Sequence, residues 1–570
     1  MKEIVIKVLK KALSAKKISL TEAEIEKLIE IPPSQEMGDY SFPCFFLSEK
    51  FHVEPSRAAI ELREKIGSIE ETDFEDIQTT GPYLNFFVNR KSLARQAVWD
   101  VITRKKNYGR TNLGKGKKTM VEFPSPNTNK PIHLGHLRNM TIGEGISRIL
   151  EFNGEKVIKS NLNNDRGIHI CKSMLAYKKW GREKTPKDKK IKPDHFVGDF
   201  YVMFEKKKNK KLEEEALEML KLWESGDKHT LLLWKLMNTW ALEGFAETYK
   251  KFGVKHDVTF FESKIYKRGK EIVSEGIKKG IFSQEKTGEV KINLEKEGLG
   301  EKILLRNDGT SLYIVQDLAL AKMKFQDFGI NNSFYVVGNE QEYHFKVLFS
   351  ILDKLGFNSK KGKQMKHISY GMVSLPSGKM KSREGTVVDA DNLIEEVRLL
   401  AEKEIKKRDK KISKAEVEKR SMTVALAAIK YLLLKTDIKK TMMFNPKESI
   451  SFDGDTGSYI LYSYARASSI MKKAPAEKKF EVYDLEEKEL ELVKKISYFP
   501  EIVESAYKNL NPSIIANYSH QLSQTFNEFY HSCKVVGSES EAFRLALVQS
   551  FRQTLKNSLW LIGIETIDKM

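Results

Sequence analysis

Two histidines three residues apart, His133 and His136, are the side chains best placed by their spacing to do chemistry. They lie in the segment VEFPSPNTNKPIHLGHLRN, residues 121–139. Residues three apart in a helix share one side, and Gly135 between them lets a flat group approach the backbone. Imidazoles placed there can donate hydrogen bonds to a phosphate whose charge grows during displacement. The alternative is two histidines that are hydrogen-bonded on an ordinary helix.

A strand, a tight turn and a helix would position this pair. Residues 119–123 read as a strand, which Pro124 and Pro126 end. The helix opens at His133, and its apolar face contains Leu137, Ile142, Ile146, Ile149 and Leu150. Free N–H groups and the helix dipole make the start of such a helix an anion site.

A glycine- and lysine-rich loop, GKMKSREG, occupies residues 378–385. Lys379 and Lys381 can neutralise the β- and γ-phosphates of a nucleotide while pyrophosphate leaves. Taken alone, a loop of this composition is commonly solvated surface. It therefore gains meaning only together with the histidine segment.

Tyr313 and Asp317, in LYIVQDLALA, are four residues apart and share one face of a predicted helix over 311–322. A carboxylate can form a two-pronged hydrogen bond with a guanidinium, and a tyrosine hydroxyl can support it. The alternative is a solvated helix with a core tyrosine. The pair is thus a candidate site for a guanidinium ligand.

Aromatic and cationic side chains alternate in the segment 451–466, SFDGDTGSYILYSYAR. Its Tyr459, Tyr462, Tyr464 and Arg466 could stack unpaired bases and hold phosphate. Rings at helical spacing are also typical of a core. The segment predicts a nucleic-acid surface or a packed helix.

Length, charge and cysteine content narrow the class of protein. The chain has 570 residues, with 98 Lys+Arg against 78 Asp+Glu, a net charge of +20. This excess favours a polyanionic partner. We find no apolar run of about 18 residues, so no membrane partner is expected. The isolated Cys44, Cys171 and Cys533 predict neither disulfides nor a zinc site, which favours a cytoplasmic protein.

The order of predicted elements indicates three domains. Residues 1–112 form a small α+β module, and 113–394 form an α/β domain with a Rossmann-like, doubly wound parallel sheet. A helical insertion at about 178–280 interrupts it, and its lysine clusters are expected to be solvated. Residues 395–570 are expected to be all-helical.

These motifs resemble those of a known family. The histidine segment is similar to the HIGH signature of class I aminoacyl-tRNA synthetases, and SPNTNKPIHLGHLRN resembles the arginyl-tRNA synthetase version. Residues 378–385 resemble the KMSKS loop, with Lys381 and Ser382 in exchanged order. The segment around Tyr313 resembles the amino-acid pocket of arginyl enzymes, and residues 451–570 resemble their anticodon-binding domain. The N-terminal module resembles the one that contacts the outer corner of tRNA.

The resemblance implies a role for each matching residue. The catalytic residues would be His133, His136, Lys130, Lys379 and Lys381. ATP would be bound by His133, Gly135, His136, Lys379 and Met380. Arginine would be bound by Glu122, Ser125, Asn127, His136, Tyr313, Asp317 and Gln341. tRNA would be bound by Tyr459, Tyr462 and Arg466, and no resident metal site is expected.

The function implied is arginine–tRNA ligase activity. L-arginine would react with ATP and Mg²⁺ to give arginyl-adenylate and pyrophosphate, and the arginyl group would pass to the 3′ end of tRNA(Arg). We expect a monomer. The alternatives are another class I synthetase, a small-molecule adenylyltransferase with the same His-x-Gly-His site, and a synthetase-derived tRNA-binding protein without activity. Length and charge count against the second, and intact His133, His136, Tyr313 and Asp317 count against the third.

Overall fold

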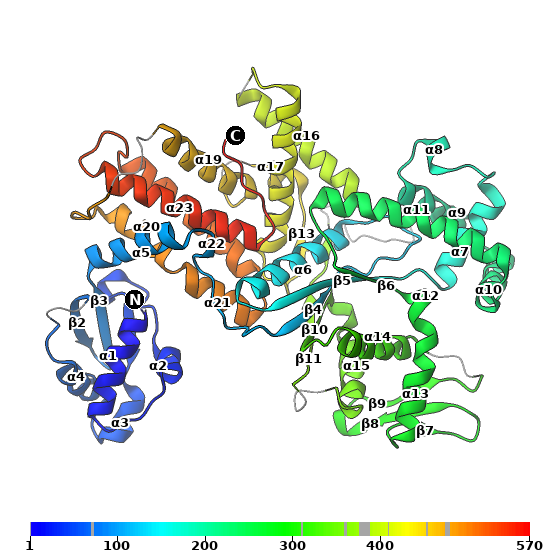
Figure 1. Ribbon diagram of the computed structural model, residues 1–570, viewed down its shortest axis with the longest axis horizontal. Coiled ribbons are helices and arrows are strands. Elements are labelled where there is room, and N and C mark those ends of the chain that lie inside the picture. The colour runs from blue at the N-terminus through cyan, green and yellow to red at the C-terminus, as the bar shows by residue number, and fades with distance from the viewer. Residues whose placement is uncertain are drawn as a thin grey trace. The chain divides into compact units, whose positions relative to one another are not determined.

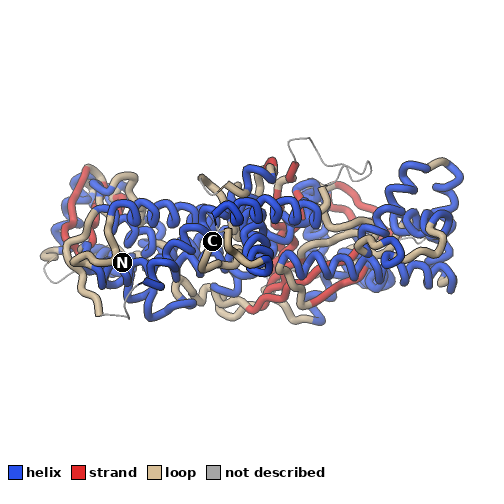
Figure 2. Tube along the Cα trace, turned by 90° about the horizontal axis from the view of Figure 1, so that it is seen from above, coloured by secondary structure: helices blue, strands red, loops and turns tan. Residues whose placement is uncertain are grey.

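The computed structural model describes residues 2–69, 73–308, 312–357, 362–374, 388–408, 410–451, 454–473 and 479–570. The chain divides into two compact units. The first comprises Met1–Tyr108, Ala467–Phe499 and Gln524–Thr554, and the second comprises Gly109–Arg466, Pro500–Ser523 and Leu555–Met570. Helix is the predominant element along the trace (Figure 2). In these described ranges no helix is both long and apolar enough to cross a membrane.

The first unit contains a three-stranded antiparallel sheet in the order β1-β3-β2. Its strands are β1 (Tyr40–Pro43), β2 (Phe74–Thr80) and β3 (Tyr83–Val88). The N-terminal helices are α1 (Lys2–Ala15), α2 (Glu22–Leu28), α3 (Phe45–Phe51), α4 (Pro55–Ile66) and α5 (Arg90–Arg104). α4 packs on β2 and β3, and α5 packs on α20 (Glu487–Ser497). The predicted α+β character of the N-terminal module is confirmed.

A five-stranded parallel sheet forms the centre of the second unit, in the order β11-β10-β4-β5-β6 (Figure 1). Its strands are β4 (Lys118–Glu122), β5 (Lys156–Asn163), β6 (Val258–Phe261), β10 (Asn332–Gly338) and β11 (Gln364–Tyr370). Every neighbouring pair in it is parallel. The predicted strand at 119–123 and the predicted doubly wound parallel sheet are therefore confirmed.

Helices cover this sheet and connect its strands. α6 (Leu134–Phe152) packs on β4, β5 and β10. Gly143 makes this close approach possible, because a Cβ there would lie 2.2 Å from the Phe123 ring. α14 (Tyr313–Asp327) packs on β10, and α15 (Glu342–Lys354) packs on β11. The strand–turn–helix that the histidine segment predicted is present as β4, the loop after it and α6.

Two insertions separate β5 from β10. The first is helical, with α7 (Ile168–Trp180), α8 (Pro186–Lys189), α9 (Pro193–Lys207), α10 (Lys210–Ser225) and α11 (Lys228–Phe252). The second contains α12 (Glu262–Ile265), α13 (Gly269–Lys278) and the antiparallel strands β7 (Ser283–Gln284), β8 (Val290–Leu294) and β9 (Gly300–Leu305). The first insertion has an apolar core of its own. The core of the second continues into the parallel sheet, through Met120 on β4 and Tyr335 on β10.

The C-terminal third of the chain is helical, as predicted. Its helices are α16 (Ala390–Arg408), α17 (Lys414–Lys435), α18 (Pro446–Ser449), α19 (Gly457–Lys473), α21 (Phe499–Asn509), α22 (Ser513–Ser532) and α23 (Glu541–Leu561), together with α20. The prediction missed one short strand in this region, β13 (Met442–Met443), which pairs with β12 (Val373–Ser374). The thiols of Cys44, Cys171 and Cys533 are free and buried.

Candidate active site

The direction in which successive strands are added to the parallel sheet reverses between β4 and β10, and a crevice is expected at the carboxyl ends of these strands. β4 leads through α6 to β5 on one side, whereas β10 leads through α15 to β11 on the other. At such a switch point the connecting helices diverge and leave a crevice for a ligand. The loops after β4, β5 and β10 meet this edge, and those after β4 and β10 contain the predicted site residues Ser125, Asn127, Lys130 and Gln341.

His133 and His136 hold each other in place at the start of α6. His133 is the extended residue that caps the helix, and its Nδ1 accepts a hydrogen bond from the Gly135 N–H at 3.1 Å. The His133 N–H in turn donates to Nδ1 of His136 at 3.2 Å. The two ring centroids are 3.8 Å apart. This reciprocal arrangement is a capping box built from histidines.

The glycine between the histidines has a specific steric role. A Cβ on Gly135 would lie 3.0 Å from Cε1 and 3.1 Å from Nδ1 of His133. The flat group that approaches the backbone at this position is therefore the ring of His133 itself. An added methyl group would push that ring away from the helix start.

Both imidazoles are neutral N–H donors. Because Nδ1 accepts a hydrogen bond in each ring, the single proton of the neutral ring is on Nε2. Burial lowers the pKa of His133 to about 4, and the positive charge of Lys130 adds to this effect. Burial also holds the pKa of His136 well below its usual range, with His133 and Lys130 contributing. The pair can therefore donate to phosphate oxygens without changing protonation near pH 7.

Of the three lysines predicted to lie around the nucleotide, only Lys130 belongs to the described residues. The ammonium group of Lys130 lies 5.0 Å from the ring centroid of Tyr201 on α9. It is close enough to the two histidines to lower both pKa values. Lys379, Met380 and Lys381 lie outside the described residues.

A cavity of about 320 Å³ opens beside β5 and α14. It brings together three residues predicted to bind arginine, namely Asn127, Tyr313 and Asp317. Tyr313 is 72% exposed and lies at the first turn of α14. The cavity is also lined by Leu162, Asn164, Arg166, Gly167, Ile168, His169, Ile170, Glu262, Ile265, Gln316 and Leu320. Glu122, Ser125, His136 and Gln341 are not part of this lining.

Asp317 already has a protein partner. Its Oδ2 lies 2.7 Å from Nε2 of His344 on α15, and both side chains are about one-third exposed. The hydrogen bond to Asp317 raises the pKa of His344. Protonated His344 would compete with a guanidinium for this carboxylate.

Glu262 is a second carboxylate in the cavity. Burial raises its pKa to about 7; Arg166 opposes this rise, and the negative charges of Asp165 and Asp317 add to it. In the orientation that satisfies both neighbours, the Gln316 amide donates to Glu262 at 2.8 Å and accepts from Arg166 at 3.1 Å. A cationic ligand would favour the ionised form of Glu262.

Glu122 lies at the end of β4 and forms a buried ion pair. Its Oε2 is 2.6 Å from Nζ of Lys324 on α14, with side-chain exposures of 6% and 0%. The same ammonium lies 4.1 Å from the centroid of the Tyr335 ring on β10. Glu122 therefore ties α14, which carries Tyr313 and Asp317, to the central strands.

The remaining predicted arginine ligands lie on the edge loops. The Ser125 carbonyl accepts a hydrogen bond from the Asn164 side chain at 3.2 Å. The backbone of Asn127 forms a parallel bridge with Asn164, which locks the loops after β4 and β5 together. Gln341 is exposed at the end of a short 3₁₀ turn that follows β10.

Tyr462 on α19 lies between two arginines. The guanidinium carbon of Arg408 is 5.4 Å from its ring centroid, and that of Arg466 is 4.8 Å away. The Tyr459 ring lies 5.5 Å from the ring of His520 on α22. Tyr464, by contrast, is only 2% exposed and belongs to the core. The structure thus separates the predicted aromatic set into half-buried and packed members.

Sequence reasoning missed Glu262, which lines the cavity, and His344, which contacts the Asp317 carboxylate. Glu262 directly follows β6, a strand that was not predicted, so its position at the carboxyl edge could not be seen. His344 lies three residues after Gln341, which was predicted to bind arginine, but no sequence spacing connects His344 to Asp317. Arg166 belongs to the Asn-Asp-Arg-Gly turn after β5, which was a usable signal.

Three family models match successive parts of the chain. Residues 1–88 match "Arginyl tRNA synthetase N terminal domain". Residues 97–445 match "tRNA synthetases class I (R), catalytic domain". Residues 460–570 match "DALR anticodon binding domain".

Whole proteins with this arrangement are also similar. The arginine–tRNA ligase of Treponema denticola is 45% identical over 563 residues, covering 95% of this chain and 94% of that protein. The one from Porphyromonas gingivalis is 47% identical over 485 residues, covering 79% and 80%. The structure of the Thermus thermophilus arginyl-tRNA synthetase covers 100% of both chains with a TM-score of 0.86 at 24% identity, a likeness of fold.

Proposed function

The chain belongs to the arginyl-tRNA synthetases of class I and is an arginine–tRNA ligase, and we propose that it forms arginyl-adenylate at the carboxyl edge of the parallel sheet. The observation that carries this proposal is the reciprocal capping of His133 and His136 at the topological switch point. ATP, L-arginine and tRNA are its substrates.

The phosphate end of the site uses fixed, neutral donors. The arginine carboxylate attacks the α-phosphorus of ATP in line, and pyrophosphate leaves. Nε2–H of His133 and of His136 donates to the phosphate oxygens as their negative charge grows. Gly135 leaves room for the His133 ring, which keeps this donor in position for ATP.

Cations complete this end. The charge of the leaving pyrophosphate is neutralised jointly by Lys130, Lys379 and Lys381. The ground for this division is the 378–385 loop, in which Lys381 and Ser382 stand in exchanged order. Mg²⁺ enters on the β- and γ-phosphates of ATP. The group His195, Asp389 and Asp391 does not fit a resident metal, because two ammonium groups already contact Asp391.

The amino-acid end uses carboxylates. The guanidinium of arginine lies in the cavity against Asp317, with the Tyr313 hydroxyl beside it and Glu262 as a second anion. Glu122 fixes α14, which carries Tyr313 and Asp317, through its ion pair with Lys324. Ser125, Asn127, His136 and Gln341 hold the polar end of the amino acid, which places its carboxylate near α6.

The second step uses the tRNA. The hydroxyl of its 3′-terminal ribose attacks the adenylate carbonyl, and AMP leaves. Bases and phosphate of the tRNA contact α19 at Tyr459, Tyr462 and Arg466. The positions of Arg408 and Arg466 beside the Tyr462 ring support this role, because they put positive charge next to a stacking surface. The division of labour follows the order of the family models: residues 1–112 contact tRNA, residues 113–394 with their insertion at about 178–280 carry the chemistry, and residues 395–570 bind the anticodon.

The enzyme is proposed to be a cytoplasmic monomer. Sedimentation of the purified protein, with and without tRNA, tests the monomeric state. A dimer at micromolar concentration would contradict it.

One experiment tests the proposed chemistry. ATP–pyrophosphate exchange is measured with each of the twenty amino acids, with and without total tRNA. We expect exchange with arginine alone. Exchange with another amino acid, or none with arginine in the presence of tRNA, would contradict the assignment of the cavity.

A further inference from the structure

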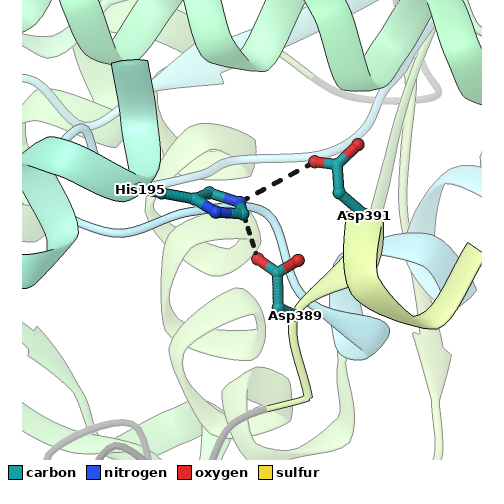
Figure 3. A group of neighbouring side chains, drawn as sticks. All are labelled: His195, Asp389 and Asp391. Atoms are coloured by element: carbon teal, nitrogen blue, oxygen red, sulfur yellow. Dashed lines mark ion pairs between the residues drawn. The ribbon is translucent and has the colours of Figure 1, made fainter. Parts of the chain in front are cut away.

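A charged cluster lies next to His133 but outside the substrate cavity. It consists of Asp389 and Asp391 with their partners His195, Lys192, Thr248 and Lys251, and we call it the Asp389–Asp391 cluster. Figure 3 shows the His195 ring pointing at both carboxylates, with α9 and α16 approaching from opposite sides. Nε2 of His195 lies 2.9 Å from Asp389 and 3.9 Å from Asp391.

The carboxylates are held by the helical insertion. Asp391 accepts hydrogen bonds from Lys192 at 2.8 Å, from Thr248 at 2.8 Å and from Lys251 at 2.7 Å. Burial favours its neutral form, but these lysines outweigh burial and lower the pKa of Asp391 to about 2. Lys192 precedes α9, and the other two partners are on α11. The cluster is therefore a charge-balanced contact rather than a cation site.

The same short segment is paired with the backbone of the catalytic histidine. The Leu134 N–H donates to the Val388 carbonyl at 2.9 Å, and the Ala390 N–H donates to the Ile132 carbonyl at 3.0 Å. These two bonds place His133 opposite Asp389 in an antiparallel bridge. Asp389 also caps α16, because its Oδ1 accepts from the Asn392 N–H at 2.9 Å.

α9 contacts the other side of this bridge as well. A Cβ on Gly198 would lie 2.8 Å from Cδ of Pro131, so the helix backbone packs directly on the residue two before His133. α9 therefore touches both strands of the bridge, through Gly198 on one and His195 on the other.

We propose that the Asp389–Asp391 cluster is a positioning device for adenylate formation, through which α9 and α11 fix the backbone of His133. The inference rests on the proposed roles of His133 and His136. Both rings depend on that backbone: the His133 N–H binds His136, and the His133 ring caps the next turn. A displacement of about 1 Å can cost on the order of 100-fold in rate. Loss of the cluster should therefore slow chemistry without weakening arginine binding.

His195 makes the device sensitive to pH. Burial lowers the pKa of His195, but the hydrogen bond and charge of Asp389 outweigh burial, so its pKa is raised. The groups that face it are Asp389 and Asp391 at α16, Asp194 and Asp199 on α9, Lys192 before α9 and Lys251 on α11. The protonated ring binds Asp389 most strongly below the raised pKa, and this contribution is lost as the pH rises through it.

The test compares variants of full-length enzyme by ATP–pyrophosphate exchange with saturating tRNA. His195→Phe fills the space without a donor, whereas His195→Gln keeps an N–H near Nε2. We expect kcat to fall about tenfold for His195→Phe, with KM for arginine within twofold of wild type, and to recover to within threefold for His195→Gln. Equal rates for wild type and His195→Phe, or equal losses in both variants, would overturn the proposal.

Further measurements cover misfolding and background effects. Asp391→Asn is nearly isosteric and should give a similar loss of kcat, so it decides the matter if His195→Phe does not fold. Glu213→Gln is the matched control, because it breaks the α7–α10 ion pair with Lys172 at 2.8 Å in the same insertion. It should retain wild-type kcat; a loss equal to that of Asp391→Asn would overturn the proposal.

The pH dependence gives an independent readout. The ratio of wild-type to His195→Gln kcat should fall about threefold from pH 6 to pH 9, because a charge-assisted hydrogen bond is about twice as strong as a neutral one. A flat ratio would overturn the role of His195 protonation. His136→Ala is measured in parallel. If it is slow while the cluster variants are not, only the positioning proposal fails; if His136→Ala is not slow, the proposed phosphate site fails.

Discussion

The two ends of the proposed active site are built on different physical plans. At the phosphate end, His133 and His136 are neutral and are held by the backbone of their own helix. At the proposed guanidinium end, Asp317 and Glu262 come from different elements. Asp317 is paired with His344, whose pKa is raised, and burial raises the pKa of Glu262 to about 7. The first end is preorganised by local geometry, and the second is balanced by charge.

This difference teaches where each kind of perturbation should act. Donors fixed by the backbone lower the barrier because they need no rearrangement as charge develops. At the other end, Asp317 must exchange its partner His344 for the ligand, and Glu262 must lose a proton when it binds a cation at low pH. Changes at the phosphate end should therefore alter kcat, whereas changes at the guanidinium end should alter KM for arginine and its dependence on pH.

The largest effect is expected from His136→Ala. Loss of one preorganised donor costs about 3 kcal/mol, so adenylate formation should slow on the order of 100-fold with KM for arginine little changed. Single-turnover rates with bound tRNA measure this, with His229→Ala on the exposed side of α11 as control. A loss under threefold would contradict the role of the phosphate end.

Asp317→Asn should act on binding instead. Removal of one partner of a charged hydrogen-bonded pair costs about 2 kcal/mol when the site is partly exposed, or about 30-fold in KM for arginine. Charging assays with arginine, lysine and citrulline measure it, with Asp327→Asn at the end of the same helix as control. If the wild type charges lysine as well as arginine, the cavity does not select a guanidinium.

Gly135→Ala tests whether local geometry sets the phosphate end. Alanine normally stabilises a helix relative to glycine, by about 1 kcal/mol. Here its Cβ would push the His133 ring away, so we expect kcat to fall about twentyfold while the melting temperature stays at or above that of the wild type. Full activity would mean that the ring position is unimportant.

The guanidinium end should respond to pH. Burial raises the pKa of Glu262 to about 7, so binding of a cation must release a proton at lower pH. The raised pKa of His344 acts in the same direction, because its protonated form retains Asp317. If arginine binds only the ionised form of Glu262, KM for arginine should rise at least about tenfold from pH 8 to pH 6. Glu262→Gln should flatten the dependence of KM for arginine on pH. An unchanged slope in that variant would mean that another group causes the pH dependence.

Tyr462→Ala should give the smallest effect, far from both ends. Stacking of one base is worth at least about 1 kcal/mol, or about fivefold in KM for tRNA. Tyr462→Phe keeps the ring and should match the wild type. A folded alanine variant with normal tRNA affinity would place Tyr462 in the packing of α19 alone.

The sequence by itself predicted the parts whose signals are local. The apolar periodicity of α6, the prolines after β4 and the His-x-Gly-His spacing depend on neighbours within a few residues, so the strand, the helix and the placement of the histidine pair could be predicted. Tyr313 and Asp317 were found for the same reason, because a helix brings residues four apart to one face. The parallel sheet was inferred from strands that alternate with helices.

Only the tertiary structure decided which distant groups meet. His344 and Glu262 have no sequence spacing that relates them to Asp317, and Lys324 has none that relates it to Glu122. The sheet order β11-β10-β4-β5-β6 brings their elements together. Their protonation was equally hidden, because a pKa depends on burial and on charges contributed by other elements. The Asp389–Asp391 cluster is the clearest case: folding sets Asp389 beside His133, far away in the sequence, through hydrogen bonds that carry no side-chain signature.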